Sequence, residues 1–495
     1  MGAFASRASA AKRQICAASE EAALVHWTAI KPQVSPVSTS SFSSLPLSAA
    51  LLGTLEHLGF EHMTPVQAQA LPLILAGHDL IAQSRTGSGK TAAFGIGLLT
   101  PLNPAFFGCQ ALVLSPTREL AAQTATALRT LARAMPNIKI ITLCGGTPFG
   151  PQAASLEQGA HVVVGTPGRI KDHLDRGTLE LKGLNCLVLD EADRMLDMGF
   201  HDAISEIIDL APKRRQTLLF SATFPPSIEA LAGRFLQTPQ RVNIEEVEPQ
   251  NPIKQRFYEI VPAERMQAVV RLLAAERLQP CIAFCHTRQQ CQDLLQHLQA
   301  HKVSALTLHG DMEQRERDEV LALFANQSCS VLVATDVAAR GIDVAGVAAV
   351  INVELSPDPA VHTHRIGRSG RAGETGLALS LVAPSEGGRA NAIESMQGQP
   401  LDWHALSTLP AGLDTPLIAP MRSLAIAGGR RDKVRPGDLL GALTGEAGLP
   451  AEAIGKISIT DYQSLVAVRR DLAPIAQQRL EQGKIKGRRF KVRLM

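Results

Sequence analysis

Short apolar runs recur along most of the chain and alternate with stretches whose hydrophobic residues are spaced as in a helix. The spacing first becomes helical from Leu51, with Leu55 and Leu58 on the same face. The alternation predicts parallel sheets covered by helices on both faces, the α/β class. The runs with the length of a buried strand are Asp79–Gln83, Ala111–Ser115, Ile138–Leu143, His161–Val164, Cys186–Asp190, Thr217–Ser221, Cys281–Cys285, Ala305–Leu308, Val331–Ala334, Val350–Glu354 and Leu377–Val382.

Two polar segments, residues 245–252 and 397–420, interrupt this alternation. Because 495 residues are too many for one hydrophobic core, we predict a first domain at 45–244 and a second domain at 256–396, joined by a linker at 245–255. A second linker at 397–420 leads to a C-terminal domain at 421–495, called the tail below. Residues 1–44 are rich in Ala and Ser and are predicted to form a disordered extension.

The tail differs from the two domains in element order and in charge. Its βαββαβ order is that of the RNA-recognition-motif sandwich, although many unrelated small domains share it. It holds fifteen Lys and Arg against seven Asp and Glu, so it carries +8 in a chain of net charge +3, and the other 420 residues carry −5. This asymmetry predicts a polyanion-binding appendage, with a solvated basic surface as the alternative. The predicted elements are Leu424–Ala427, Gly437–Leu443, Lys456–Ile459, Leu465–Arg469, Leu472–Gln482 and Arg489–Leu494.

Composition narrows the class of protein. The apolar runs are strand-sized, and none reaches the roughly 18 residues that a membrane-spanning helix requires. The eight cysteines are scattered without a CxxC pair. This spacing favours reduced thiols in a cytoplasmic protein over a zinc site or a disulfide framework.

A phosphate-binding loop is predicted where residues 84–91 read SRTGSGKT, between a strand and a helix. Its glycines allow backbone N–H groups to turn toward phosphates, and the helix N-terminus favours negative charge. We expect Lys90 to neutralise the β/γ oxygens and the Thr91 hydroxyl to ligate Mg²⁺. The strict pattern has Gly where this chain has Ser84. The predicted nucleotide-binding residues of the loop are Ser84, Arg85, Thr86, Gly87, Ser88, Gly89, Lys90 and Thr91.

Two acids stand at the end of the apolar run 186–190 and directly after it. We expect Asp190 to hold Mg²⁺ and Glu191 to orient and deprotonate the attacking water. A surface acid pair that caps the next helix is the alternative. The phosphate loop upstream favours the catalytic interpretation, because a Mg–phosphate site needs such a carboxylate.

An arginine-rich loop lies near the end of the second domain, where residues 364–371 read HRIGRSGR. Its glycines allow close approach to a ligand. Arg368 and Arg371 are therefore candidates for arginine fingers on the γ-phosphate. A loop that only grips an RNA backbone is the alternative.

These motifs, with VLDEAD at residues 188–193, resemble in order and type those of the DEAD-box RNA helicases. The resemblance implies two RecA-like domains in tandem, the first ATP-binding and the second the helicase C-terminal domain, and an RNA-stimulated ATPase that unwinds RNA. It implies that Phe60 packs on adenine while the Gln67 amide reads the edge of the base, and that Gly341 and Asp343 lie near the ribose and phosphates. The residues implied to couple hydrolysis to domain closure are Asp193, Ser221, Thr223 and His364.

The same resemblance implies RNA contacts at loop ends in both domains. Glycines, hydroxyls and arginines there suit sugar–phosphate contact, because sequence-independent binding grips the backbone rather than the bases. The residues concerned are Pro116, Thr117, Arg118, Gly145, Gly146, Thr166, Gly168, Arg169, Gln314, Arg317, Thr335 and Arg340.

The tail resembles the C-terminal domain of a bacterial branch of the same family, notably at Gly428-Gly429, residues 435–445 and residues 482–487. This resemblance implies a 23S ribosomal RNA target and a role in assembly of the large ribosomal subunit, with the tail as anchor. The predicted tail strands Leu424–Ala427 and Leu465–Arg469 have no aromatic residue for base stacking, so we predict binding by basic edges and loops. The leading cluster is Lys484, Lys486, Arg488, Arg489, Lys491 and Arg493.

Three alternatives stay open at this point. A DNA helicase or translocase could use the same two-domain ATPase core, although the adenine motif, the DEAD residues and the tail argue against this class of protein. An ATP-gated RNA clamp or RNA–protein remodeller with little strand-separating activity would need the same core motifs. The tail could mediate dimerisation, whereas we expect a monomer. The expected cofactors are ATP and Mg²⁺, and the expected partners are 23S ribosomal RNA and precursors of the large subunit, with no membrane.

Overall fold

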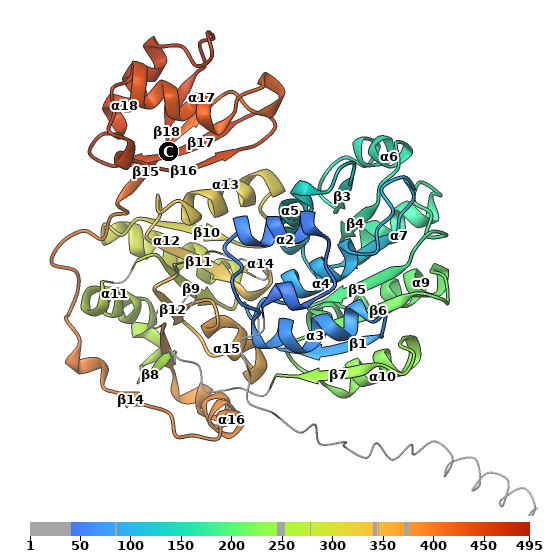
Figure 1. Ribbon diagram of the computed structural model, residues 1–495. Helices are drawn as coiled ribbons and strands as arrows, with labels where there is room; N and C mark the ends of the chain where they lie inside the picture. The colour runs from blue at the N-terminus through green and yellow to red at the C-terminus, as the bar shows by residue number, and fades with distance from the viewer. Residues whose placement is uncertain are drawn as a thin grey trace, which may run out of the picture.

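The computed structural model describes residues 41–84, 87–244, 253–277, 279–339, 344, 346–370 and 376–495. These residues form two seven-stranded sheets, one in each of the two domains, and a four-stranded sheet in the tail (Figure 1). The two large sheets are parallel and the tail sheet is antiparallel, which confirms the predicted α/β class with an RRM-like tail. No helix in these ranges is both long and apolar enough to cross a bilayer.

The sheet of the first domain has the strand order β3-β4-β2-β5-β6-β1-β7. Successive strand residues enter opposite cores: Leu80 and Ala82 face one, and Ile81 faces the other. Both faces are covered, so the central strands are apolar throughout. The strands are β1 Leu80–Gln83, β2 Ala111–Leu114, β3 Ile140–Leu143, β4 Val162–Gly165, β5 Cys186–Asp190, β6 Gln216–Ser221 and β7 Gln240–Asn243; the helices are α2 Ala49–His57, α3 Pro65–Leu75, α4 Lys90–Leu99, α5 Arg118–Leu131, α6 Phe149–Glu157, α7 Pro167–Asp175, α8 Ala192–Asp197, α9 His201–Leu210 and α10 Pro226–Phe235.

The sheet of the second domain has the order β10-β11-β9-β12-β13-β8-β14. It repeats the arrangement of the first sheet, with apolar cores on both faces. The strands are β8 Lys254–Glu259, β9 Cys281–Cys285, β10 Ala305–Leu308, β11 Val331–Thr335, β12 Ala349–Asn352, β13 Leu377–Val382 and β14 Trp403–His404; the helices are α11 Arg265–Glu276, α12 Arg288–Ala300, α13 Gln314–Ala325, α14 Asp336–Ala339, α15 Pro359–Ile366 and α16 Gly387–Gln397.

Residues 397–420, predicted to be a linker, pack against the second domain. They contribute the edge strand β14, which pairs with β8. Leu406 and Leu417 are buried in the core of this domain. Arg271 on α11 donates to the carbonyl oxygens of Leu409 and Pro410 at 2.8 and 3.0 Å. The segment is therefore held to the second domain along its length.

Three strands, β7, β8 and β14, were not predicted from the sequence; in β8 only Phe257 and Tyr258 are buried. In β7 only Val242 is buried, and β14 has two residues, so neither produces an apolar run. The predicted extension 1–44 also ends earlier than expected, because Phe42–Ser44 form a 3₁₀ turn and Phe42 is buried. Residues 1–40 lie outside the described residues.

The tail has the predicted βαββαβ order, with strand order β16-β17-β15-β18. Its helices cover one face of the sheet, where Leu424, Val466 and Leu480 share one core. The strands are β15 Met421–Ile426, β16 Ile454–Ile459, β17 Ser464–Arg469 and β18 Val492–Leu494, and the helices are α17 Pro436–Gly441 and α18 Ala473–Gln482. In Figure 1 the tail lies beside α13 of the second domain.

Candidate nucleotide and nucleic-acid site

The phosphate loop connects β1 to α4, as predicted. Gly87 and Gly89 have φ values of +86° and +95°, a left-handed backbone that favours glycine. A Cβ atom on Gly89 would lie 2.5 Å from Nε2 of Gln67, so a side chain there would displace the Gln67 amide. The buried Lys90 ammonium donates to the carbonyl oxygen of Ser84 at 2.8 Å. Ser84, where the strict pattern has Gly, accepts a hydrogen bond from the Ser88 hydroxyl at 3.1 Å. Arg85 and Thr86 lie outside the described residues.

Gln67 and Phe60, the predicted adenine contacts, lie beside this loop. The Gln67 Oε1 accepts from the Thr64 backbone N–H at 2.8 Å, and its Nε2 donates to the Gly89 carbonyl at 3.1 Å. Phe60 meets the buried Phe42 edge to face, with ring centroids 6.0 Å apart. The contact from Phe42 was missed, because no sustained pattern surrounds that residue.

The two predicted catalytic carboxylates lie at the carboxyl end of β5. Burial raises the pKa of Asp190 to about 7; Glu191 adds to this effect and Lys90 opposes it. Glu191 has a φ of +53°, a strained conformation for a residue with a side chain. Its Oε2 lies 3.1 Å from Nη1 of Arg194 but, within the described residues, is buried without a hydrogen-bond partner. The sequence did not identify Arg194 as part of this group.

Asp193 connects residues 190–193, called the DEAD segment below, to the end of β6. Its Oδ2 accepts from both the backbone N–H and the hydroxyl of Thr223, each at 2.9 Å. The Asp193 N–H donates to the Ser221 hydroxyl at 3.3 Å, and that hydroxyl donates to the Thr223 carbonyl at 2.7 Å. Three of the four residues predicted to couple hydrolysis to closure are thus joined directly in the first domain.

His364 and Arg368 of the second domain face this segment. Burial, together with the positive charge of Arg194 across the domain boundary, lowers the pKa of His364 to about 4. Residues of both domains, including Arg194, His364 and Arg368, surround a cavity of about 30 Å³. The structure therefore brings one predicted arginine finger and one coupling residue to the DEAD segment. The predicted residues Arg371, Gly341 and Asp343 lie outside the described residues.

Arg365 is a buried residue of α15 that the sequence analysis did not identify. Its Nε and Nη2 donate to the two carboxylate oxygens of Asp336 at 2.6 and 2.7 Å. Its Nη1 donates to the Glu354 carbonyl at 2.7 Å and to Oδ1 of Asn352 at 3.2 Å. These bonds fix the helix that carries His364 to the carboxyl ends of β11 and β12.

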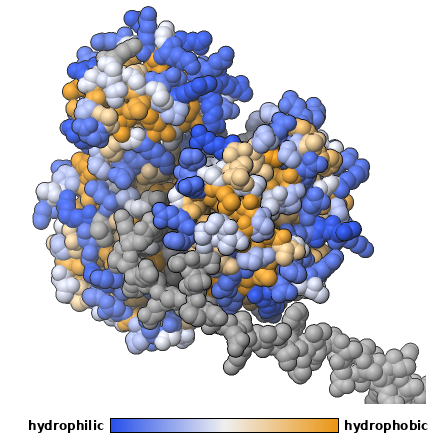
Figure 2. All heavy atoms as spheres, viewed as in Figure 1, coloured by the Kyte–Doolittle hydropathy of each residue, from blue (hydrophilic) through white to orange (hydrophobic). Residues whose placement is uncertain are grey.

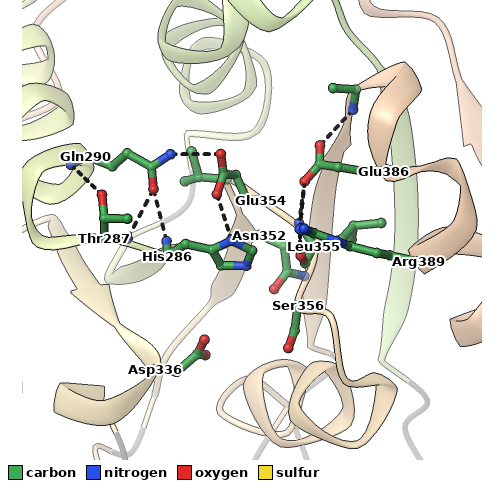
Figure 3. A network of polar contacts seen from close by, with 12 residues as sticks. His286, Thr287, Gln290, Asp336, Asn352, Glu354, Leu355, Ser356, Glu386 and Arg389 are labelled. Carbon is green, nitrogen blue, oxygen red and sulfur yellow. Dashed lines mark hydrogen bonds and ion pairs between the residues drawn. The ribbon is translucent and has the colours of Figure 1, made fainter.

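The segment after β12 is itself held by the polar network shown in Figure 3. Glu354 accepts from Nδ1 of His286 at 2.9 Å and from Nε2 of Gln290 at 2.7 Å. The His286 hydrogen bond is the main cause that lowers the pKa of Glu354 to about 2. Glu386 accepts from the Leu355 N–H at 3.1 Å, and Arg389 donates to the Leu355 carbonyl at 2.8 Å. The support for α15 is therefore rigid.

Four residues on the predicted RNA face connect the two domains. Nη1 of Arg118 donates to Oε1 of Gln314 at 2.9 Å. Nη2 of Arg317 donates to Oε1 of Glu119 at 3.1 Å, and both side chains are mostly buried. A Cβ atom on Gly146 would overlap the Arg118 guanidinium. Glu119 was not predicted, although it follows Arg118 directly in the sequence.

The remaining predicted RNA contacts lie at the carboxyl ends of strands. Arg169 donates to the Thr147 carbonyl and to Oε1 of Gln152, both at 3.1 Å. Thr117 accepts from the Leu120 N–H at the start of α5. The other described residues of this set are Pro116, Gly145, Thr166 and Gly168 in the first domain and Thr335 in the second. Arg340 lies outside the described residues.

The basic cluster of the tail lies on its surface. Lys484, Lys486, Arg488 and Arg489 are exposed around the buried Ile485. Nζ of Lys486 donates to the Lys433 carbonyl at 3.0 Å and lies 3.7 Å from Oδ2 of Asp438. The cluster is therefore connected to the loop that follows β15.

Two parallel-sheet domains, with a phosphate loop on the first and with His364 and Arg368 of the second beside Arg194 of the first, define a two-domain helicase ATPase. The sequence matches the DEAD/DEAH box helicase family at residues 64–231, the helicase conserved C-terminal domain at 264–373 and the DbpA RNA binding domain at 423–494. The chain belongs to the DEAD-box helicases and is an ATP-dependent RNA helicase with a DbpA-type RNA-binding domain.

Relatives and solved structures agree with this assignment. The chain is 52% identical to the ATP-dependent RNA helicase DbpA of Escherichia coli over 458 residues, which are 92% of this chain and 100% of the relative. It is 40% identical to the DEAD-box helicase CshA of Geobacillus kaustophilus over 76% of this chain and 80% of the relative. Saccharomyces cerevisiae Dbp5 bound to RNA and ADP BeF3 superposes with a TM-score of 0.69 and 32% identity, covering 74% of this chain and 96% of that one. The predicted resemblance of the tail to that of a bacterial branch of the family is confirmed.

Proposed function

We propose that this helicase binds ATP and Mg²⁺ between its two domains, closes on RNA, and separates short duplexes in 23S ribosomal RNA during assembly of the large subunit. The observation that carries the proposal is the position of His364 and Arg368 around one cavity with Arg194, directly after the DEAD residues, together with the Arg317–Glu119 ion pair on the predicted RNA face. In this proposal both the ATP site and the RNA site are shared by the two domains. A ligand held by both domains favours the closed state.

The residues at the phosphate loop fit a magnesium–nucleotide complex. Asp190 and Glu191 are buried carboxyl groups, and a divalent cation is favourable beside them. Thr91, with its hydroxyl, lies in the first turn of α4. The described residues contain no cluster of three or more acidic, His or Cys ligands, which agrees with an ion that keeps most of its ligands from water and phosphate. When bound, Mg²⁺ neutralises charge that develops on the phosphates.

The side chains of the chain have separate roles around the nucleotide. Lys90 exchanges its bond to Ser84 for the β/γ oxygens. Glu191, whose Oε2 is buried and has no hydrogen-bond partner among the described residues, accepts the proton of the attacking water. Arg368 stabilises the negative charge on the transferred group from the second domain, with Arg371 as the other candidate.

Coupling to closure follows from the bonds around Asp193. Thr223 and Ser221 tie the DEAD segment to the end of β6, and His364 approaches the same segment from the second domain. Loss of phosphate weakens the contacts between domains, and the RNA is then released. This cycle favours local strand separation.

The tail directs the enzyme to its RNA. The similarity to the E. coli helicase DbpA covers the tail, and the basic cluster offers phosphate contacts outside the core. We infer a cytoplasmic, monomeric enzyme that acts on precursors of the large subunit.

Stimulation of ATP hydrolysis by RNA fragments tests this function. We expect fragments of 23S RNA to stimulate at lower concentration than unrelated RNA of equal length. Neutralising Lys484, Lys486, Arg488 and Arg489 to Gln should remove that preference, and a matched control with Lys182, Lys213, Arg214 and Lys302 neutralised should keep it. Equal stimulation by both RNAs in the parent would refute the target. A strand-displacement assay run beside the ATPase assay separates a helicase from an RNA clamp.

A further inference from the structure

Two loops of the tail are joined at its edge: residues 427–433, which follow β15, and residues 460–463, which connect β16 to β17. The backbone N–H of Arg430 donates to the Thr460 carbonyl at 2.9 Å, and that of Arg431 donates to the Asp461 carbonyl at 3.1 Å. A Cβ atom on Gly429 would lie 2.5 Å from the Asp461 carbonyl oxygen, so only glycine allows this approach. The two loops therefore act as one fixed unit, called the loop pair below.

The loop pair presents an aromatic ring and two arginines to solvent. Tyr462 is 60% exposed. The Arg431 guanidinium lies over the ring, 4.5 Å from its centroid. A cation over one face is attracted to the ring, and the exposure of the side chain leaves surface for a second partner. Arg430 is also exposed, with Asp461 3.9 Å away.

The loop pair lies against the core at the point where the two domains meet. The Gln463 amide accepts from Arg315 at 3.4 Å and donates to Glu319 at 3.5 Å, both on α13. Arg493 of β18 reaches the same Glu319 at 3.7 Å. On the side of the first domain, partial burial and the charge of Arg430 lower the pKa of Arg129 on α5. In Figure 2 the side of the tail that faces the first domain is largely hydrophilic.

Both ends of the loop pair adjoin surfaces already assigned to RNA. Gln314 and Arg317, in the first turn of α13, bridge to Arg118 and Glu119 of the first domain. At the other end, Lys433 accepts a hydrogen bond from Lys486 of the tail cluster. The loop pair thus completes a basic path from that cluster to the core.

The tail does not need to move to complete this path. The Asn326 amide donates to the buried Ser423 hydroxyl at 2.7 Å, and Ser328 shares that hydroxyl at 2.9 Å. The Met421 N–H donates to the Gln327 carbonyl at 3.3 Å. These bonds join β15 to the turn after α13, so the direction of the loop pair is set by the second domain.

We propose that Tyr462, Arg430 and Arg431 bind a single-stranded stretch of RNA on its way between the tail cluster and the core. The arginines contact phosphates, and one unpaired base stacks on the open face of Tyr462. An aromatic ring accepts any base, so this contact is independent of sequence. Inside a duplex the neighbouring base pairs cover both faces of every base, so a single-stranded stretch offers far more free base surface to the ring. The site rests on the proposed function and extends it, because the RNA then needs a single-stranded stretch next to the part that the basic cluster of the tail holds.

Binding of labelled RNA by fluorescence anisotropy tests the site. The probes are a blunt duplex and the same duplex with a single-stranded extension, both unrelated in sequence to ribosomal RNA. We expect the parent to prefer the extended probe. Tyr462→Ala should weaken binding of the extended probe by about tenfold, as loss of one stacked base does, and should leave the blunt probe unchanged. Tyr462→Phe keeps the ring and should bind like the parent. Trp403→Ala removes another exposed aromatic, on β14, and is the matched control.

Crosslinking gives a second readout that does not depend on affinity. RNA with 5-iodouridine in the extension should crosslink to the peptide that contains Tyr462. The site is refuted if Tyr462→Ala binds the extended probe as tightly as the parent, or if the crosslinks map elsewhere. A parent with no preference for 23S fragments would refute the ribosomal target alone, because these probes contain no ribosomal sequence.

Discussion

Arg317 of the second domain donates to Glu119 of the first, with 3.1 Å between Nη2 and Oε1. The side chains are only 14% and 10% exposed, so the charges are shielded from water. Gln314, one helical turn earlier, lies near the same carboxylate and also accepts from Arg118. Three residues predicted from the sequence as RNA contacts, Arg118, Gln314 and Arg317, therefore also hold the domains together.

The Glu119→Gln substitution should raise the RNA concentration needed for half-maximal ATPase stimulation by about fivefold. The reason is that a shielded ion pair between domains, worth about 1 kcal/mol, no longer favours closure. ATP hydrolysis without RNA should not change. The exposed pair Arg234–Asp209, at 3.2 Å within the first domain, is the control, and Asp209→Asn should behave like the parent. An unchanged RNA requirement in Glu119→Gln would show that the pair does not contribute to closure.

The Glu191→Gln substitution should lower the rate of ATP hydrolysis by about 10²–10⁴-fold, as expected on removal of a general base. Binding of nucleotide and RNA should persist, because the amide keeps the size and polarity of the carboxylate. Steady-state ATPase measurements check the loss of hydrolysis. Equilibrium RNA binding with a nonhydrolysable ATP analogue checks that binding persists. Hydrolysis at the parental rate would exclude Glu191 as the base.

The Asp336→Ala substitution should destabilise the second domain by about 3 kcal/mol or more. It leaves the guanidinium of Arg365, with 1% exposure, buried without its carboxylate. Urea unfolding measures the change. The exposed pair Arg469–Asp471 gives the comparison, since Asp471→Asn should cost less than about 1 kcal/mol. Equal effects of the two substitutions would contradict the structural role of Arg365.

The stability of the second domain should fall as pH is lowered, partly because of His362. This histidine is fully buried, and burial, followed by the charge of Arg365, lowers its pKa to about 4. His362 binds a proton more readily in the unfolded chain than in the folded protein. The stability that the neutral, buried His362 contributes is therefore fully present above the ordinary histidine pKa of about 6.5 and is lost as the pH falls toward 4. At pH 5 the loss should be about 2 kcal/mol.

Comparison with His362→Gln tests this contribution. Its free energy of unfolding should depend less on pH between 7.5 and 5 than that of the parent, whatever its absolute stability. The exposed His201 is the control, and His201→Gln should keep the parental slope. The same pH slope in His362→Gln and the parent would exclude His362 as a source of the pH dependence.

The fold of both domains was largely predictable from the sequence. Parallel strands buried on both faces are apolar at every position, so β2, β5 and β9 appear as continuous runs. The edge strand β7 was missed because only Val242 is buried and the local pattern is polar.

The chemistry of the site was predictable where one short segment carries it. The phosphate loop needs Gly87 and Gly89 next to Lys90, and the DEAD residues follow directly on a strand. Such groups depend on local geometry, so their spacing in the sequence indicates them.

Contacts between distant segments were decided only by the tertiary structure. Phe42 against Phe60, Arg365 against Asp336, Arg317 against Glu119 and the tail loops against α13 all join segments that packing brings together. The hydrophobic periodicity of a segment says which face is buried but not which other segment covers it. For this reason the sequence by itself determined the two domains, the ATP motifs and the basic tail, whereas the bonds that join them into one RNA-binding enzyme follow from tertiary packing.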